Sequence, residues 1–305
     1  MDAANDDTEL IGTTVSRYSI VDMIGCGGMG RVYRARDERL QRHVAIKVCN
    51  RERGSQADSD RELQAEARAL SRLSHPHIAA IYDLLSEAER DFIVMEFVAG
   101  ATLKELLGNG PLPFPEVLGL GKQMMQGLAA AHAAQLVHRD IKPANLKVTP
   151  SGELKILDFG LAQMLPSASG NKPTGGLTTR TPTEFGVEGT MPYMSPEQLR
   201  GELADERSDI FSAGAVLYEM ATGLPAFPQT RMALLVDAIL HQQPVEPSLL
   251  NPRVPTAFDR LVSRAMEKRP SRRYQCAGEV EAALDALCIG RRAPRVAHWL
   301  SGILG

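Results

Sequence analysis

Near Gly100 the spacing of apolar residues changes from a strand pattern to a helix pattern. Across residues 18–49, apolar and polar residues alternate in two short runs around a group of glycines, which predicts hairpin strands. Beyond Gly100, apolar residues recur at three- and four-residue steps, first across residues 116–136. Because strands come first and helices second, we expect an α+β fold with two lobes. The first is a small antiparallel sheet with one main helix, and the second is larger and mainly helical.

The same two patterns predict the remaining elements. Apolar steps of three and four residues indicate the main helix of the first lobe at residues 60–73, and His75-Pro76 ends it. Residues 78–85 and 92–97 are typical of strands, and the second is apolar enough to be buried. Further helices are predicted at residues 209–222, 231–242, 256–266 and 277–287.

At 305 residues, the chain is long enough for two lobes. We place an N-terminal extension at residues 1–17, an N-terminal lobe at 18–98, a C-terminal lobe at 99–289 and a basic, apolar tail at 290–305. Residues 165–185 are rich in Ser, Thr, Gly and Pro, which predicts a functional loop inside the domain. The tail could lie on an acidic membrane surface or dock on another domain, but we favour a short helix that packs on the C-terminal lobe.

The composition excludes several classes of protein. Hydrophobic residues at 44% and charged residues at 23% predict an ordered core, and a net charge of −3 provides no basic field for nucleic acid. The four cysteines lack zinc-site spacing and fit a reducing cytosol, so we expect a cytoplasmic protein. The start is acidic and has no apolar core, so we expect no secretory signal there. The sequence contains no window of about 18 apolar residues, so we expect no transmembrane span.

A glycine-rich motif, G-x-G-x-x-G-x-V, occupies residues 25–32. Glycines let the backbone approach phosphate oxygens without interference from Cβ. A dinucleotide-binding fold shares the glycines, but there they open a helix, whereas residues 31–36 continue as a strand-like run. The motif therefore favours a strand-turn-strand flap over phosphates, with an ordinary glycine-rich hairpin as the alternative.

Lys47 ends the short apolar strand Val44-Ala45-Ile46 and can place a cation against phosphates. A lone lysine at a strand end is usually only solvated, so its partner matters. Glu66 lies on the apolar side of the predicted helix and could fix Lys47 in an ion pair. Glu62 competes, but it begins the helix and suits the helix dipole, so we prefer Glu66.

The strongest signal is the run His138-Arg139-Asp140-Ile141-Lys142-Pro143-Ala144-Asn145, which a short apolar strand and then Asp158-Phe159-Gly160 follow. In phosphoryl transfer, Asp140 would accept or orient the proton of the attacking hydroxyl, and Lys142 would neutralise charge on the phosphoryl group. Asn145 and Asp158 would hold magnesium. Surface solvation or a helix cap explains any one of these carboxylates equally well, but not the joint pattern.

From about residue 18 to residue 287, these motifs stand in the order found in eukaryotic-type serine/threonine protein kinases of bacteria, and the chain resembles that family. Met194-Ser195-Pro196-Glu197 stands where the family usually has Ala-Pro-Glu. The resemblance implies that the chain uses ATP with Mg²⁺, or alternatively Mn²⁺, to phosphorylate serine or threonine hydroxyls of proteins. It also implies autophosphorylation on the activation loop, for which self-association would bring two copies together.

The resemblance assigns further roles within the second lobe. Glu197 is expected to pair with Arg273, and Asp209 to brace the catalytic loop from a buried helix, with His138 and Phe159 as structural members of their motifs. Lys142 together with Gly189-Thr190 resembles the serine/threonine class rather than the tyrosine class, so Thr190 is expected to contact Asp140 and Lys142.

A phosphorylated activation loop could engage the cation of Arg139 and become ordered by charge-assisted hydrogen bonds. Thr181 and Thr183 are the preferred phosphosites. Thr174, Thr178 and Thr179 remain alternatives, as does a loop whose threonines have no such role.

The strand that enters the connection between the lobes predicts an adenine site. Met95 resembles the gatekeeper, Glu96 and Val98 are expected to offer backbone groups, and Val32 and Ala45 to pack above the ring. Lys147 stands below, where the family normally has an apolar residue, and its aliphatic stem could cover the ring. The full expected nucleotide site comprises Ile24, Gly25, Cys26, Gly27, Gly28, Met29, Gly30, Arg31, Val32, Ala45, Lys47, Met95, Glu96, Val98 and Lys147.

Two other functions are weighed against catalysis on proteins. A kinase fold that is catalytically dead and senses ATP usually lacks Lys47, Asp140 or Asp158, and all three are present. A phosphotransferase acting on small molecules would not need residues 189–197, which shape a peptide site.

Overall fold

The computed structural model describes residues 10–27, 30–50, 73–87, 90–158 and 190–288. Two compact units divide the described chain, and each is treated by itself. The N-terminal unit takes the described residues up to 74 together with residues 79–98. The C-terminal unit takes residues 75–78 and the remainder. The predicted helix at residues 60–73 lies outside the described residues, apart from its final residue.

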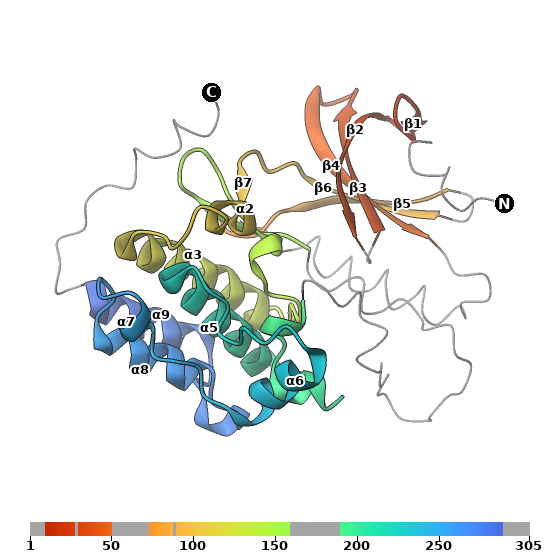
Figure 1. Cartoon of the computed structure of the whole chain (residues 1–305). Coiled ribbons are helices and arrows are strands. Elements are labelled where there is room, and N and C mark those ends of the chain that lie inside the picture. Colours follow the sequence, from red (N-terminus) through yellow and green to blue (C-terminus); the bar gives the residue numbers. More distant parts are fainter. Residues whose placement is uncertain (1–9, 28–29, 51–72, 88–89, 159–189, 289–305) are drawn as a thin grey trace. The chain divides into compact units, whose positions relative to one another are not determined.

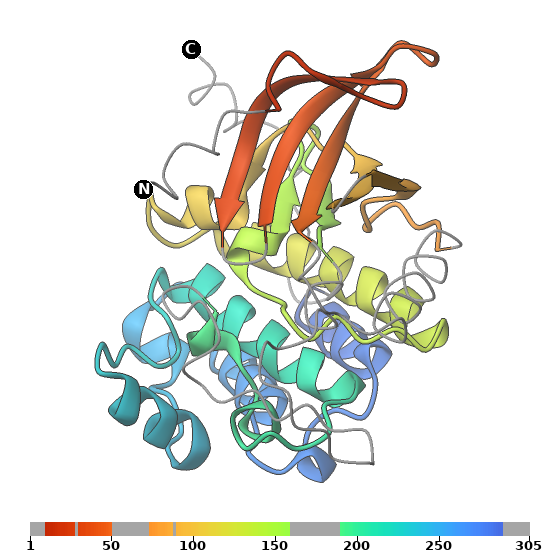
Figure 2. The same cartoon turned by 90° about the vertical axis from the view of Figure 1, so that its right-hand side faces the viewer.

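The N-terminal unit is built on a six-stranded sheet in the order β1-β2-β3-β4-β6-β5, with every neighbouring pair antiparallel (Figures 1 and 2). Residues Thr14–Val15 form β1, so part of the segment before residue 18 belongs to the sheet. The other strands are β2 Tyr18–Gly27, β3 Gly30–Asp37, β4 Arg42–Asn50, β5 Ile81–Glu87 and β6 Arg90–Glu96.

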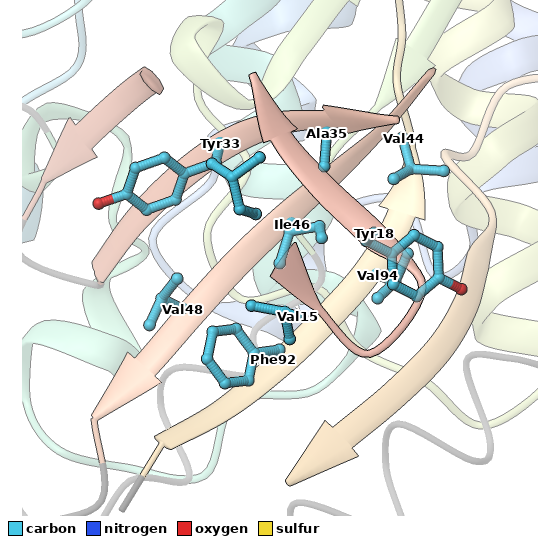
Figure 3. Close-up of a cluster of buried hydrophobic side chains, with 10 residues drawn as sticks. Val15, Tyr18, Tyr33, Ala35, Val44, Ile46, Val48, Phe92 and Val94 are labelled. Carbon is cyan, nitrogen blue, oxygen red and sulfur yellow. The ribbon is translucent and has the colours of Figure 1, made fainter. Parts of the chain in front are cut away.

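One face of this sheet carries the apolar core of the unit. Side chains that alternate along β1, β2, β3, β4 and β6 gather there, as Figure 3 shows for the labelled residues. The cluster consists of Val15, Tyr18, Ile20, Tyr33, Ala35, Val44, Ile46, Val48, Phe92 and Val94. Because successive strand residues point to opposite faces, the residues between these positions lie on the other face of the sheet.

The C-terminal unit is mainly helical (Figure 1). Its helices are α2 Leu103–Leu107, α3 Phe114–Ala133, α4 Pro196–Leu199, α5 Glu206–Thr222, α6 Met232–His241, α7 Pro247–Leu250, α8 Thr256–Ala265 and α9 Ala277–Cys288. Short 3-10 helices occupy Pro143–Asn145, Met191–Tyr193 and Pro270–Arg272. A small antiparallel sheet joins β7 Ala101–Thr102, β8 Leu146–Val148 and β9 Leu154–Ile156 in that order.

Helix α5 lies at the centre of this unit and contacts both α3 and α8. The side chain of Asp205 accepts a hydrogen bond from the backbone of Arg207 and caps the start of α5. At its other end Gly223 takes a left-handed conformation, with φ of 72°, which lets the chain leave the helix sharply. Almost every residue of α5 between these caps is buried, so the helix is a fixed support for the segments that pack on it.

The expectation of an antiparallel sheet followed by a helical lobe is confirmed. The long periodic helices start and end within three residues of their predicted bounds. The strand expected at residues 78–85 starts later, at Ile81, because residues 75–78 pack with the C-terminal unit through the bridge between Ile78 and Ile156.

Candidate active site

Asp209 organises the loop that follows α3. It lies in the first turns of α5, fully buried, and its carboxylate accepts three hydrogen bonds. The donors are the backbone N–H groups of His138, at 2.8 Å, and Arg139, at 2.7 Å, and the ring Nε2 of His132, at 2.9 Å. Three donors compensate the burial of one carboxylate, so the loop is fastened to the central helix.

His138 ties the same loop to the end of β9. Its Nδ1 accepts a hydrogen bond from the backbone N–H of Asp140 at 3.2 Å, so Nε2 carries the proton and donates to the carbonyl of Leu157 at 2.9 Å. The backbone N–H of Leu157 in turn donates to the carbonyl of Asn145 at 2.8 Å. These bonds place Asp158, the next residue, beside the loop that carries Asp140 and Asn145.

The two carboxylate oxygens of Asp140 have different surroundings. Oδ2 lies 2.9 Å from Nζ of Lys142 and accepts a hydrogen bond from Nδ2 of Asn145, also at 2.9 Å. Oδ1 is buried and accepts no hydrogen bond from any described residue. A buried carboxylate oxygen without a donor is costly, so the site is suited to a hydroxyl donor that arrives with a substrate.

Lys142 connects Asp140 to Thr190, the first described residue after residue 158. Besides its contact with Asp140, its Nζ donates to Oγ1 of Thr190 at 2.6 Å. Of the two contacts expected for Thr190, the one to Lys142 is therefore present, and Asp140 is linked to Thr190 through the lysine. The ammonium group therefore lies between the carboxylate of Asp140 and the hydroxyl of Thr190, where it can also bind an anionic group of a substrate.

The residues expected to hold a divalent metal fit that task chemically. The amide of Asn145 uses Nδ2 for two hydrogen bonds to Asp140, at 2.8 and 2.9 Å, which leaves its carbonyl oxygen as an available ligand. Asp158 adds a carboxylate. Mg²⁺ prefers oxygen ligands and commonly takes only one or two carboxylates plus substrate phosphates. Among the described residues, no group of three or more His, Cys, Asp or Glu side chains is arranged to hold a metal ion.

Two residues of the site have left-handed backbones. The φ angle is 65° at Arg139 and 50° at Asp158, a region that costs a non-glycine residue on the order of 1–3 kcal/mol. Such conformations persist only where surrounding contacts hold them. The hydrogen bond from the N–H of Arg139 to Asp209 is one such contact.

A buried ion pair joins Glu197, in α4, to Arg273, as the sequence resemblance implies. The two guanidinium nitrogens lie 2.6 and 2.7 Å from the two carboxylate oxygens, and Ser208 donates a third hydrogen bond at 2.6 Å. Burial opposes ionisation of Glu197, but the hydrogen bonds and charge of Arg273 outweigh it and lower the pKa of this carboxyl. The pair fixes the start of α4, three residues after the 3-10 helix that follows Thr190.

In the N-terminal unit, several predicted nucleotide-site residues share the sheet face opposite the apolar core. Strand pairing sets Val32 beside Lys47 and Ala45 beside Met95, and all four alternate with core residues along their strands. Lys47 is only 3% exposed although it carries a charge. At the end of β6, the backbone N–H of Glu96 donates to the carbonyl of Ala80, and Val98, two residues further on, is buried.

The glycine motif needs glycine most clearly at Gly30. Its φ of 115° lies in the left-handed half of the map, and a Cβ there would lie 2.4 Å from the carbonyl oxygen of Val48. By contrast, a Cβ at Gly25 would meet only Val32, at an ordinary 3.8 Å. Ile24, just before the motif, and Cys26, within it, are exposed, and Arg31 pairs with Cys26 across the hairpin.

Lys147 lies in β8, where it pairs with Thr102. Burial lowers the pKa of its ammonium group, whereas the negative charge of Glu105 acts in the opposite direction. Two hydrogen bonds to Glu105, from the backbone and the hydroxyl of Thr102 at 2.6 and 2.8 Å, hold that carboxylate and lower its pKa. The lysine is therefore half-buried and has a fixed counter-charge nearby.

Some predicted residues cannot be placed, and the structure adds others. Glu66, Gly28, Met29, Phe159, Thr181 and Thr183 lie outside the described residues. His132, Gln198 and Glu105 contact the site but were not singled out from the sequence, and Ser195 was noted only as the serine in place of the family's usual alanine. The last three belong to Ser/Thr-x-x-Glu/Gln capping boxes at α4 and α2, a local pattern that could have revealed them.

Comparison with known proteins identifies the family. A family model described as the protein kinase domain matches residues 18–283. The chain belongs to the protein kinase family. The kinase domain of Mycobacterium tuberculosis PknI has a similar fold, with a TM-score of 0.70 at 25% identity over 90% of this chain and 97% of that chain.

Two bacterial kinases are among the curated relatives. The chain is 41% identical over 278 residues to serine/threonine-protein kinase PrkC of Bacillus subtilis. This match covers 90% of this chain and 41% of PrkC. It is 37% identical over 273 residues to serine/threonine-protein kinase PknL of Mycobacterium tuberculosis, covering 89% of this chain and 66% of PknL. The chain thus spans less than two thirds of the length of either relative. No helix among the described residues is long and apolar enough to cross a membrane.

Proposed function

We propose that this kinase-family chain is a serine/threonine protein kinase domain that transfers the γ-phosphoryl group of ATP to protein hydroxyls. The observation that carries the proposal is the arrangement of Asp140. One of its oxygens is held by Lys142 and Asn145, and the other is buried without a hydrogen-bond donor. The names of the relatives PrkC and PknL support the same class of activity.

In this mechanism the substrate hydroxyl donates its hydrogen bond to Oδ1 of Asp140. As the oxygen–phosphorus bond forms and the bond to the ADP leaving group breaks, Asp140 takes the proton. Lys142 neutralises charge on the phosphoryl group while its bond to Thr190 keeps its ammonium in position. Asn145 and Asp158 would hold Mg²⁺, which neutralises phosphate charge when bound.

The nucleotide-binding part of the proposal rests on the N-terminal sheet. Lys47 would meet the α- and β-phosphates, and Glu66 would pair with it. Val32, Ala45 and Met95 would line the base, and the backbones of Glu96 and Val98 would bind its edge, with Lys147 beneath. The glycine flap, from Ile24 to Val32, would cover the phosphates.

Selectivity for serine and threonine is proposed from the Lys142–Thr190 contact at 2.6 Å together with the names of the relatives. Autophosphorylation on Thr181 and Thr183, between two associated copies, is part of the same proposal. Arg139 would bind the phosphorylated loop.

The test is to incubate the purified chain with ATP and Mg²⁺ and to map phosphosites by mass spectrometry. Asp140→Asn should lower the rate by about 10²- to 10⁴-fold, because the proton acceptor is lost. Asp237→Asn, at an exposed position of α6, is the matched control and should retain activity. Chelation of the metal should abolish labelling, and added Mg²⁺ or Mn²⁺ should restore it.

Three results would contradict the proposal. If the unmodified chain phosphorylated nothing, the proposed kinase activity would be contradicted. Equal labelling by the unmodified chain and Asp140→Asn would contradict the proposed role of Asp140. Labelling confined to tyrosine would remove the serine/threonine selectivity.

A further inference from the structure

The side-chain amide of Gln198 joins two segments of the site that are far apart in the sequence. Gln198 lies in α4, and its Nε2 donates a hydrogen bond of 2.8 Å to the backbone carbonyl of Arg139, 59 residues earlier. That carbonyl belongs to the peptide bond between Arg139 and Asp140. Gln198 therefore holds the peptide group immediately before the proposed proton acceptor.

Arg139 needs such support because of its backbone conformation. At a φ of 65°, this non-glycine residue is strained, and other loop conformations compete with it. The structure holds both of its backbone polar groups. The N–H is bonded to Oδ1 of Asp209 at 2.7 Å, and the carbonyl to Gln198. The two bonds hold opposite ends of the residue, so each limits a rotation that the other leaves free.

Ser195 sets the direction of the Gln198 amide. Both the backbone N–H and the hydroxyl of Ser195 donate to Oε1 of Gln198 at 3.0 Å, and the N–H of Gln198 lies 3.4 Å from the same hydroxyl. With Oε1 facing two donors, Nε2 must face Arg139, because an amide has its acceptor and its donors at opposite ends. This is the position at which the chain has serine instead of the family's usual alanine. An alanine would keep the backbone donor and lose the hydroxyl.

We infer that Gln198 is a positioning residue for Asp140 and that Ser195 orients it, so that the segment from Ser195 to Gln198 controls the geometry of the loop that carries Asp140. This inference rests on the proposed function. The competing explanation is that the pair only caps α4 as a capping box. A cap affects the stability of the helix, whereas a positioning residue changes turnover without a matching change in nucleotide binding.

The experiment measures kcat, KM for ATP and thermal stability of the purified 305-residue chain. Gln198→Met keeps the length of the side chain and removes both polar groups, and should lower kcat by about tenfold, the value of one hydrogen bond. KM for ATP should stay within about twofold. Gln126→Met is the matched control, because Gln126 is also half-buried and donates a hydrogen bond of 2.7 Å, to Glu281 between α3 and α9. It should leave kcat unchanged.

Two further variants separate positioning from capping. Gln198→Glu keeps an oxygen for Ser195 but presents no donor to the Arg139 carbonyl, so it should fold with the cap intact and still lose kcat. It also serves if Gln198→Met does not fold. Ser195→Ala should lower kcat by about threefold alone and by much less in the Gln198→Met background, because the two residues act through one bond.

A readout without activity keeps the inference separate from the proposed function. The backbone amides of His138 and Arg139 are protected by Asp209, and loss of the Gln198 bond should accelerate their hydrogen exchange. If the unmodified chain is inactive but hydrogen exchange is still faster in Gln198→Met, the positioning inference stands and the kinase proposal is contradicted. Unchanged exchange, unchanged kcat in Gln198→Glu, or additive effects of Ser195 and Gln198 would overturn the inference.

Discussion

At the scale of single residues, Lys147 is the clearest departure from the family pattern. We expect it at the position where the family usually has an apolar side chain beneath the base, and its half-burial makes the charged form costly. The nearby carboxylate of Glu105, fixed by Thr102, offsets part of that cost. The stem of Lys147 is apolar, so the residue can cover a base while its ammonium faces Glu105.

Replacing Lys147 with leucine tests this account. We expect Lys147→Leu to lower KM for ATP by about threefold or more with little change in kcat, because desolvation of the ammonium no longer opposes binding. Steady-state kinetics over a range of ATP concentrations measure it. Lys104→Leu, at an exposed position of α2, is the control and should leave KM unchanged. A higher KM in Lys147→Leu would show that the ammonium itself contributes to nucleotide binding.

At the scale of elements, close packing decides where a helix tolerates a larger residue. At Gly214 in α5, a Cβ would lie 2.9 Å from Cβ of Ala265 and 3.0 Å from Cγ of Met266, in and beside α8. At Gly119 in α3, a Cβ would meet nothing within 4 Å. Both glycines lie within apolar helices, but Gly214 is closely packed against a neighbouring helix and Gly119 is not.

The same substitution should therefore have opposite effects in the two helices. Gly214→Ala should lower the free energy of unfolding by about 1–3 kcal/mol, because α5 and α8 must separate. Gly119→Ala should raise it by about 0.5–1 kcal/mol, because alanine favours the helix and fills open space. Urea unfolding followed by circular dichroism measures both. Shifts of the same sign would show that helix propensity outweighs packing here.

At the scale of the whole molecule, Lys268 makes stability depend on pH. Its Nζ is buried and donates no hydrogen bond to any described residue, and it lies 4.5 Å from the centre of the Phe227 ring. Burial, with the charge of Arg273, lowers the pKa of Lys268 from 10.5 to about 8. Below pH 8 the lysine is charged in both the folded and unfolded states. Between about pH 8 and 10.5 Lys268 is protonated only in the unfolded state. The contribution of Lys268 to the free energy of unfolding therefore rises with pH across this range.

Comparison with Lys268→Met isolates this contribution from all other titrating groups. Across pH 8 to 10.5, the unfolding free energy of the unmodified chain should rise relative to that of Lys268→Met, by on the order of 2–3 kcal/mol. Urea unfolding at half-unit steps of pH measures the difference. Lys104→Met, at an exposed lysine, should show no such rise. A constant difference for Lys268→Met would contradict a lowered pKa.

Much of the fold follows from local pattern. Helices such as α5, α8 and α9 contain enough turns for their apolar period to be visible in the sequence. The short elements β1, β7, α2, α4 and α7 were missed, because two to five residues carry no recognisable period. These short elements form through hydrogen bonds and caps supplied by neighbouring segments, as in the capping boxes of α2 and α4.

The site shows the same division. Residue order alone predicts the glycine motif, Lys47, the stretch from His138 to Asn145, and Asp158 as site residues, because the chemical role of such short motifs can be inferred without a fold. Only the tertiary structure decides that Gln198 reaches Arg139, that His132 joins two backbone amides on Asp209, and that one oxygen of Asp140 is left without a donor. The reason is physical: hydrogen-bond direction and burial depend on which segments pack together, and segments 59 to 77 residues apart meet only when helices such as α4 and α5 pack against the loop.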